Sequence, residues 1–252
     1  MGKYQLTVEE KQQLDQQGYI VIPDVLSEEE INHYRPRILE LAEIEQQNGL
    51  GLVHTDGKGQ LVRWLVNKGQ EFERLVAHPR VVPYFEYMLG SDYILSTLTS
   101  NTIRPGAKDG GYHLDYSLGQ MPEPLPRFPI FANTLWLLDD FTPQNGGTRF
   151  VPASHLRLKK PPVGLESDPE EVRLNAPKGS VFVFNGAIWH SAGANRTNCE
   201  RVALICFCGR SFMKPQFDFV HHLKPEVYER ASPEMRRIYG FDSQPRKPDE
   251  LY

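Results

Sequence analysis

From Gly90 onward, the chain alternates short apolar runs with proline and glycine residues. Several short strands at such intervals are typical of a β-sandwich or barrel. The sequence therefore predicts an antiparallel double-sheet core around which the rest of the chain must pack. The runs that predict strands cover residues 93–103, 131–138, 148–151, 180–184 and 202–208.

The segments that flank this core carry helical signals. Thr7 opens one helix and Ser27 a longer one, each with a glutamate three residues later in a capping-box pattern. We expect one domain over residues 1–252, mainly β with flanking helices (α+β). Its expected parts are a mostly helical segment 1–90 containing a strand at 19–23 and a glycine-rich loop at 46–59, a core 91–220, and a C-terminal helix (225–239) and tail within 221–252.

The amino-acid composition and net charge of the chain exclude some classes of binding partner. Of the 252 residues, 40% are hydrophobic, enough to bury a core, and the formal net charge is −4 with no long run of Lys or Arg. Nucleic acid and anionic membranes are therefore not expected partners. No apolar stretch reaches the length of a membrane span, and the first ten residues are polar, so a cytoplasmic location is expected.

One short motif has the residue types of a metal site. His113 and Asp115 stand two apart and would project from the same face of an extended strand. His190, which follows a distant apolar run, supplies a possible third ligand. Two histidines and one carboxylate form the facial triad of non-haem Fe(II) oxygenases. Zinc accepts the same set in hydrolytic sites, so ligand type alone leaves the metal open.

Arg201 opens the last apolar run of the core. A buried guanidinium needs an anionic partner, and its planar fork suits a carboxylate. Two interpretations remain at this point: an ion pair with an acidic residue of the core, or a binding site for an anionic ligand.

Taken together, the motifs resemble the phytanoyl-CoA dioxygenase family in order and over nearly the whole chain. This resemblance implies a double-stranded β-helix (jelly-roll, cupin-like) core and an Fe(2+)- and 2-oxoglutarate-dependent dioxygenase that uses O2. The motifs are Gly18-Tyr19 with Pro23, His113-Leu114-Asp115, the segment 137–142, Asn145-Gly146-Gly147-Thr148, Pro152-Ala153-Ser154-His155, Trp189-His190 and Arg201.

Matched position by position, the resemblance assigns roles to single residues. His113, Asp115 and His190 correspond to the iron ligands, and Arg201 to the arginine that binds the distal carboxylate of 2-oxoglutarate. Further candidates for the lining of the co-substrate pocket are Thr134, Trp136 and, more weakly, Thr102. One departure is Ala192, which stands where some relatives have a serine in contact with 2-oxoglutarate. Members of the family that chlorinate their substrates lack the carboxylate ligand. Because Asp115 is present here, the resemblance implies that chlorination is disfavoured.

The substrate is much less constrained by the sequence. The resemblance implies hydroxylation, or another oxidation such as desaturation, epoxidation or rearrangement, of an unactivated carbon of a small-molecule metabolite. Aromatic and cationic residues near the motifs favour a small anionic or amphiphilic molecule. These candidates are Tyr116, Arg63, Trp64, Arg210 and Phe212. The oligomeric state is not predicted.

Two functions of other classes remain open. A zinc-dependent hydrolase could use the same triad, but it needs a general base that the sequence does not identify. A non-catalytic jelly-roll binding protein could keep the shape alone, although the intact set of three ligands and Arg201 counts against it.

Overall fold

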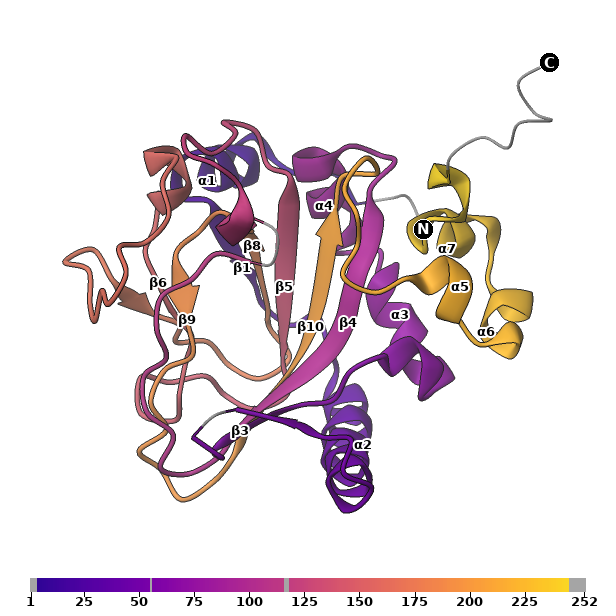
Figure 1. Ribbon diagram of the computed structural model, residues 1–252, viewed down its shortest axis with the longest axis horizontal. Helices are drawn as coiled ribbons and strands as arrows, with labels where there is room; N and C mark the ends of the chain where they lie inside the picture. The colour runs from indigo at the N-terminus through magenta and orange to yellow at the C-terminus, as the bar shows by residue number, and fades with distance from the viewer. Residues whose placement is uncertain (1–3, 55, 116–117, 245–252) are drawn as a thin grey trace.

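Two antiparallel sheets face each other in the manner of a jelly roll (Figure 1). The computed structural model describes residues 4–54, 56–115 and 118–244. The large sheet has the strand order β1-β8-β5-β10-β4-β3-β2, and the small one the order β7-β6-β9. The strands are β1 Tyr19–Ile22, β2 Leu52–Val53, β3 Gly59–Leu61, β4 Ile94–Ile103, β5 Phe131–Leu137, β6 Arg149–Phe150, β7 Val172–Arg173, β8 Val181–Asn185, β9 His190–Ser191 and β10 Arg201–Gly209.

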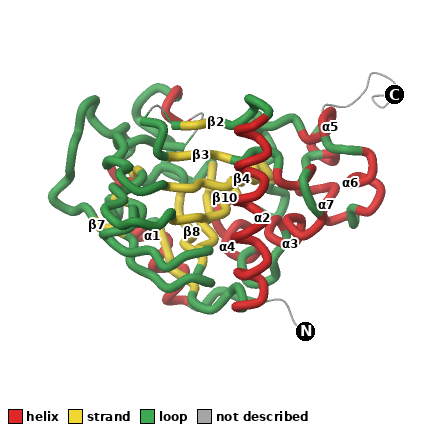
Figure 2. The backbone as a smooth tube through the Cα atoms, turned by 90° about the horizontal axis from the view of Figure 1, so that it is seen from below, coloured by secondary structure: helices red, strands yellow, loops and turns green. Residues whose placement is uncertain are grey.

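Helices cover the outer face of the large sheet. Figures 1 and 2 place α2 to α7 on the side of this sheet that faces away from the small sheet. The α-helices are α1 Val8–Gln17, α2 Glu28–Gln47, α3 Glu73–Val76, α4 Val82–Leu89, α5 Phe219–His222, α6 Pro225–Arg230 and α7 Pro233–Ile238. Short 3-10 helices lie at Leu65–Asn67, Gln70–Phe72, Leu118–Gln120, Ser154–Arg157 and Phe241–Ser243.

Side-chain alternation along the strands divides the interior into layers. On β5, Trp136 belongs to the core shared with the helices, whereas Leu135 and Leu137 belong to a second core between the two sheets. The inner side of the large sheet is therefore available to form a cavity, and the helices stabilise its outer side by burying apolar surface.

The predicted helix starts and strands are confirmed. Thr7 and Ser27 each form a complete capping box at the beginning of α1 and α2. The five strands predicted after Gly90 are present as β4, β5, β6, β8 and β10, with ends that differ by a residue or so. β1 lies within the predicted segment 19–23.

The segment 1–90 contains the expected strand, since β1 pairs with β8, and β3 joins the large sheet by pairing with β4. Two expectations about the flanking segments need correction. The glycine-rich segment 46–59 is not all loop: it holds β2, which pairs with β3 as a hairpin. The single helix expected over 225–239 is instead two short ones, α6 and α7, since Pro233 starts a new helix.

No helix in the described ranges is both long enough and apolar enough to cross a bilayer. The expected cytoplasmic location stays a prediction.

Gly18 lies in the turn between α1 and β1, and its substitution tests how tightly the N-terminal segment is packed against the core. Gly18 has φ +80°, and a Cβ there would lie 2.6 Å from Nδ1 of His155. Gly57 has φ +69° with nothing within 4 Å of its Cβ position. Left-handed backbone costs about 1–2 kcal/mol in either alanine variant, and only Gly18→Ala adds the steric overlap. Urea unfolding should show a larger loss of stability for Gly18→Ala than for Gly57→Ala. Equal losses would contradict the packing described here.

Candidate metal centre and its cavity

A backbone bridge joins the two histidine-bearing segments. The N–H of His113 donates to the carbonyl of His190 over 3.0 Å, and the N–H of His190 donates back over 3.2 Å. His190 also pairs through β9 with Phe150 on β6. The two imidazole rings therefore lie together, with ring centroids 4.4 Å apart.

Both imidazoles are held by their own backbone. Nδ1 of His113 lies 3.1 Å from the carbonyl oxygen of Gly111, and Nδ1 of His190 lies 2.9 Å from that of Ile188. A carbonyl only accepts, so Nδ1 carries the proton in each ring and Nε2 keeps its lone pair. Metal-binding histidines commonly have their second nitrogen fixed in this way.

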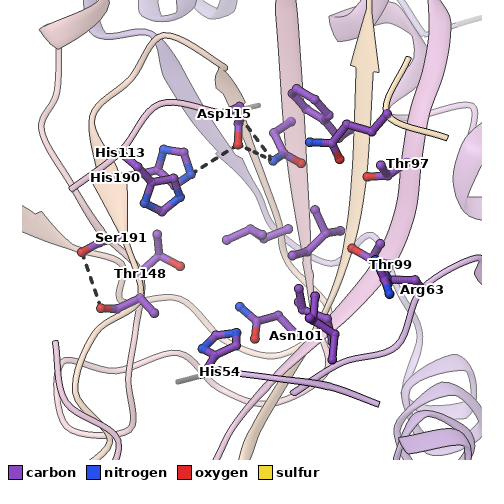
Figure 3. A pocket seen from close by; sticks show the side chains of 18 of the residues that line it. His54, Arg63, Thr97, Thr99, Asn101, His113, Asp115, Thr148, His190 and Ser191 are labelled. Carbon is purple, nitrogen blue, oxygen red and sulfur yellow. Dashed lines mark hydrogen bonds and ion pairs between the residues drawn. The ribbon is translucent and has the colours of Figure 1, made fainter. Parts of the chain in front are cut away.

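Asp115 lies beside this pair. Its Oδ1 is 3.5 Å from Nε2 of His190, and its two oxygens are 3.4 and 3.5 Å from Nδ2 of Asn133 on β5. The N–H of Asp115 donates to the carbonyl of Gly186, which fixes its backbone against the turn after β8. Figure 3 shows Asp115, His113 and His190 gathered on one wall of a cavity.

Burial sets the charge of these groups. It raises the pKa of Asp115 to about 7 and lowers the pKa of His190 to about 4. Burial, together with the neighbouring His190, lowers the pKa of His113 to about 4. Both imidazoles are therefore neutral at pH 7, the state that a metal ligand requires. A bound cation would favour the ionised form of Asp115.

The three side chains offer donor atoms that fit a metal ion: Nε2 of two neutral imidazoles, each with its lone pair free, and the carboxyl oxygens of Asp115. Within the described parts of the chain, no group of three or more His, Cys, Asp and Glu side chains stands ready-made around a single point. Binding therefore requires the side chains to adjust. The contact between the rings of His113 and His190, whose planes are tilted by 52°, is the one that must open.

Arg201 is buried without an anionic partner among the residues that the structure describes. Its side chain is 2% exposed, its Nε has no hydrogen-bond partner, and its guanidinium lies 4.2 Å from the ring centroid of Phe141. Burial lowers its pKa to about 9, against the charge of Asp139. Asp139 instead pairs with Arg35 at 2.8 Å. Arg201 therefore forms no ion pair with an acidic residue of the described core, and this interpretation is wrong.

One cavity of about 600 Å³ connects the His/Asp cluster with Arg201. Its size lies in the range of sites for small ligands, roughly 300–1,000 Å³. Ala192, the position noted as a departure from the family pattern, also lines it. A charged ligand that extends from the cluster to Arg201 would satisfy the orphaned guanidinium.

The three further candidates for the co-substrate pocket are placed on the wrong face. Thr134 donates to the carbonyl of Cys206 and accepts from Nε1 of Trp136, both at 3.0 Å. Trp136 packs against His78 on the helix-covered side. Neither these two nor Thr102 line the cavity. The correction is a shift of one residue: Asn133, Leu135 and Asn101 occupy the inward positions.

The substrate candidates are dispersed. Arg63 lines the cavity. Trp64 does not, although its ring stacks on Phe217, which does. Arg210 donates to the carbonyls of Pro129 and Met88 and lies in a separate depression. Phe212 is 68% exposed in another one. Tyr116 lies outside the described residues.

Several lining residues escaped the sequence analysis. They alternate along one face of β4 or lie on the hairpin: Thr97, Thr99, Asn101 and His54. A polar residue in an apolar strand is the usual signal, but β4 reads Ile-Leu-Ser-Thr-Leu-Thr-Ser-Asn-Thr-Ile, with polar residues on both faces. Its pattern therefore cannot select the inward face.

A charged network supports the segment before His113. Tyr112 donates to Glu171 over 2.5 Å, and Arg149, which is 3% exposed, bonds both Glu171 at 2.7 Å and the carbonyl of Gly110 at 3.2 Å. These contacts connect the segment that carries His113 to β6 and to Glu171, which precedes β7.

The raised pKa of Asp115 predicts a pH-dependent stability of the metal-free protein. In the unfolded chain this carboxyl titrates near about 3.9. Its folded pKa of about 7 means that folding becomes less favourable as pH rises between these values. Asp115→Asn removes this cost, so with chelator present the variant should gain stability over the wild type at pH 8 but not at pH 4. A gain independent of pH in urea unfolding would contradict the assignment.

The outward position of Thr134 predicts a structural role. Thr134→Val leaves the buried N–H of Trp136 without its acceptor, which costs about 1–3 kcal/mol of stability. Ligand affinity at the cavity should stay unchanged, whereas Asn133→Val, its inward neighbour, should weaken it. Urea unfolding and calorimetric titration with 2-oxoglutarate measure the two effects. Weaker ligand binding in Thr134→Val than in Asn133→Val would place Thr134 in the pocket after all.

Known proteins with related sequences include dioxygenases. "Dioxygenase af480" of Aspergillus fumigatus is 25% identical over 231 residues, which cover 89% of this chain and 74% of that protein. Ectoine dioxygenase of Stutzerimonas stutzeri is 23% identical over 220 residues, covering 75% of this chain and 72% of the relative.

Solved structures with similar folds include HygX of Streptomyces hygroscopicus, determined with nickel, 2-oxoglutarate and hygromycin B bound. It superposes with a TM-score of 0.67 at 18% identity, covering 83% of this chain and 90% of HygX. The epimerase SnoN, determined with Fe³⁺, α-ketoglutarate and nogalamycin RO, gives a TM-score of 0.63 at 21% identity, covering 85% and 88%. These likenesses show the jelly-roll fold. The model of the phytanoyl-CoA dioxygenase (PhyH) family matches residues 14–203, and the chain belongs to that family.

Proposed function

We propose that the protein is an Fe(II)- and 2-oxoglutarate-dependent dioxygenase that hydroxylates, or otherwise oxidises, an unactivated carbon of a small molecule. This proposal rests on one cavity that has a possible metal site at one end and a buried guanidinium at the other. At one end lie two neutral imidazoles and the carboxyl of Asp115. At the other lies the buried guanidinium of Arg201, which has no anionic partner among the described residues. A dicarboxylate that contacts a metal at one end and Arg201 at the other satisfies both.

Each group has a distinct task in this proposal. His113, Asp115 and His190 hold Fe(II), and Arg201 binds the distal carboxylate of 2-oxoglutarate. When bound, iron supplies the oxidising chemistry together with O2 and 2-oxoglutarate. The chain orients the co-substrate and excludes water, a task to which the apolar walls formed by Leu135, Phe184, Ile205 and Phe207 are suited.

The alternative functions explain less of the cavity. A zinc hydrolase uses the same three ligands but gives the burial of Arg201 no purpose. It also needs a general base, and Asp115 is the one carboxylate among the described residues that line the cavity. A binding protein without catalysis has no need of two imidazoles whose Nε2 atoms are kept free by backbone contacts.

Arg201→Lys tests the proposed role of the guanidinium. Lysine keeps the charge but loses the planar fork, so the affinity for 2-oxoglutarate should fall about tenfold or more while Fe(II) binding persists. The matched control is Arg196→Lys, an exposed arginine that does not line the cavity. Anaerobic calorimetry with 2-oxoglutarate and the rate of succinate release report the effect.

Two results would contradict the proposal. Unchanged 2-oxoglutarate affinity in Arg201→Lys would remove this residue from the co-substrate site. Turnover of a substrate with Zn²⁺ in the absence of both O2 and 2-oxoglutarate would favour the hydrolase instead.

A further inference from the structure

Arg63 is a second cation of the cavity wall, at the end of the β2–β3 hairpin. It is exposed, and its guanidinium makes no ion pair, hydrogen bond or ring contact with the residues that the structure describes. In Figure 3, Arg63 and Thr99 lie across the cavity from His113 and His190. Its charge thus faces the space between the proposed iron site and the hairpin.

The backbone next to Arg63 is fixed in an unusual conformation. The next residue, Trp64, has φ +59°, a left-handed conformation that is strained for a bulky side chain. The ring of Trp64 stacks on Phe217 with centroids 4.6 Å apart and planes 9° apart. On the other side of Arg63, the carbonyl of Val62 accepts from the backbone N–H of Ser100 on β4. Lys68 donates to the carbonyl of Arg63. Together these contacts hold the backbone from which the side chain of Arg63 extends to line the cavity.

The charges of the cavity leave Arg63 without a counter-charge. Apart from Asp115, which the proposed function assigns to the metal, no acidic residue is found in the described part of the lining. The distal carboxylate of 2-oxoglutarate is assigned to Arg201, and its keto acid end to the metal. The substrate is then the remaining component that can bring a negative charge to Arg63.

Polar side chains next to Arg63 extend this surface. Thr97, Thr99 and Asn101 share the inward face of β4 and line the cavity. None of them forms a side-chain hydrogen bond within the described chain, and Oδ1 of Asn101 is buried without a partner. A ligand with hydrogen-bonding groups beside its anionic group would satisfy them.

We propose, building on the function proposed above, that the substrate is a small polar anion whose carboxylate or phosphate is bound by Arg63. Thr97 and Thr99 then contact the polar groups that lie between this anion and the carbon to be oxidised. The charge of Arg63 thus selects anionic substrates and sets which end of them points away from the metal.

Equilibrium dialysis tests this selection without knowledge of the substrate. The protein, loaded anaerobically with Fe(II) and 2-oxoglutarate, is dialysed against a mixture of matched pairs: carboxylic acids with their primary amides, and phosphate monoesters with their parent alcohols. Mass spectrometry measures each compound on both sides of the membrane. Enrichment should be confined to members of the charged class and should fall about tenfold or more in Arg63→Gln. Arg63→Lys should lose less, since it keeps the charge.

The control is Arg127→Gln, which removes the same charge from an exposed arginine outside this cavity and should keep the enrichment. Retention of 2-oxoglutarate, read in the same dialysis, should be equal in the wild type and Arg63→Gln. Enrichment of neutral compounds, of no compound, or of the same anions in Arg63→Gln overturns the inference. Loss of 2-oxoglutarate from Arg63→Gln overturns it too, by placing Arg63 in the co-substrate site. Failure of the wild type to retain 2-oxoglutarate at all would instead contradict the proposed function.

Discussion

The reciprocal backbone hydrogen bonds between His113 and His190 are the constraint on which the site depends. They join a segment that enters the fold after β4 to a strand of the small sheet, so that two imidazoles far apart in the sequence lie within contact. Asp115 follows two residues later and reaches the same point. Without this bridge, the segment that carries His113 would lose its backbone pairing with β9.

The cavity holds charges whose burial is unfavourable without a ligand. Asp115 has a raised pKa, and Arg201 has a lowered one, because burial removes each of them from water. Such a site is poor at stabilising the empty fold and well suited to binding a cation and a dicarboxylate. Stability is supplied elsewhere, by the apolar core between the large sheet and helices α2 and α4.

The sequence predicts the fold better than the lining of the site. The capping boxes at Thr7 and Ser27 and the apolar runs after Gly90 are local signals, and the structure follows them. Short strands such as β2, β3 and β9 form because neighbouring strands offer them backbone partners, and no local sequence pattern predicts them.

Thr134 and Trp136 illustrate why single lining residues are harder to predict. Successive residues of a strand face opposite sides, so a shift of one position exchanges the cavity for the helix-covered core. Resemblance located the strand correctly but not its inward face, which depends on the pairing with Cys206 and Phe207 of β10. The position of Arg63 depends on contacts with the C-terminal segment around Phe217, which lies far away in the sequence.

The central claim is that one cavity binds Fe(II) and 2-oxoglutarate together, and anaerobic absorption spectroscopy tests it most directly. Addition of 2-oxoglutarate to the Fe(II)-loaded protein should produce a weak visible band that saturates at one equivalent. The band should be absent in His190→Ala, which lacks the proposed metal ligand on β9. A wild-type protein that gives no band with both components present, or an equally intense band in His190→Ala, would contradict the account.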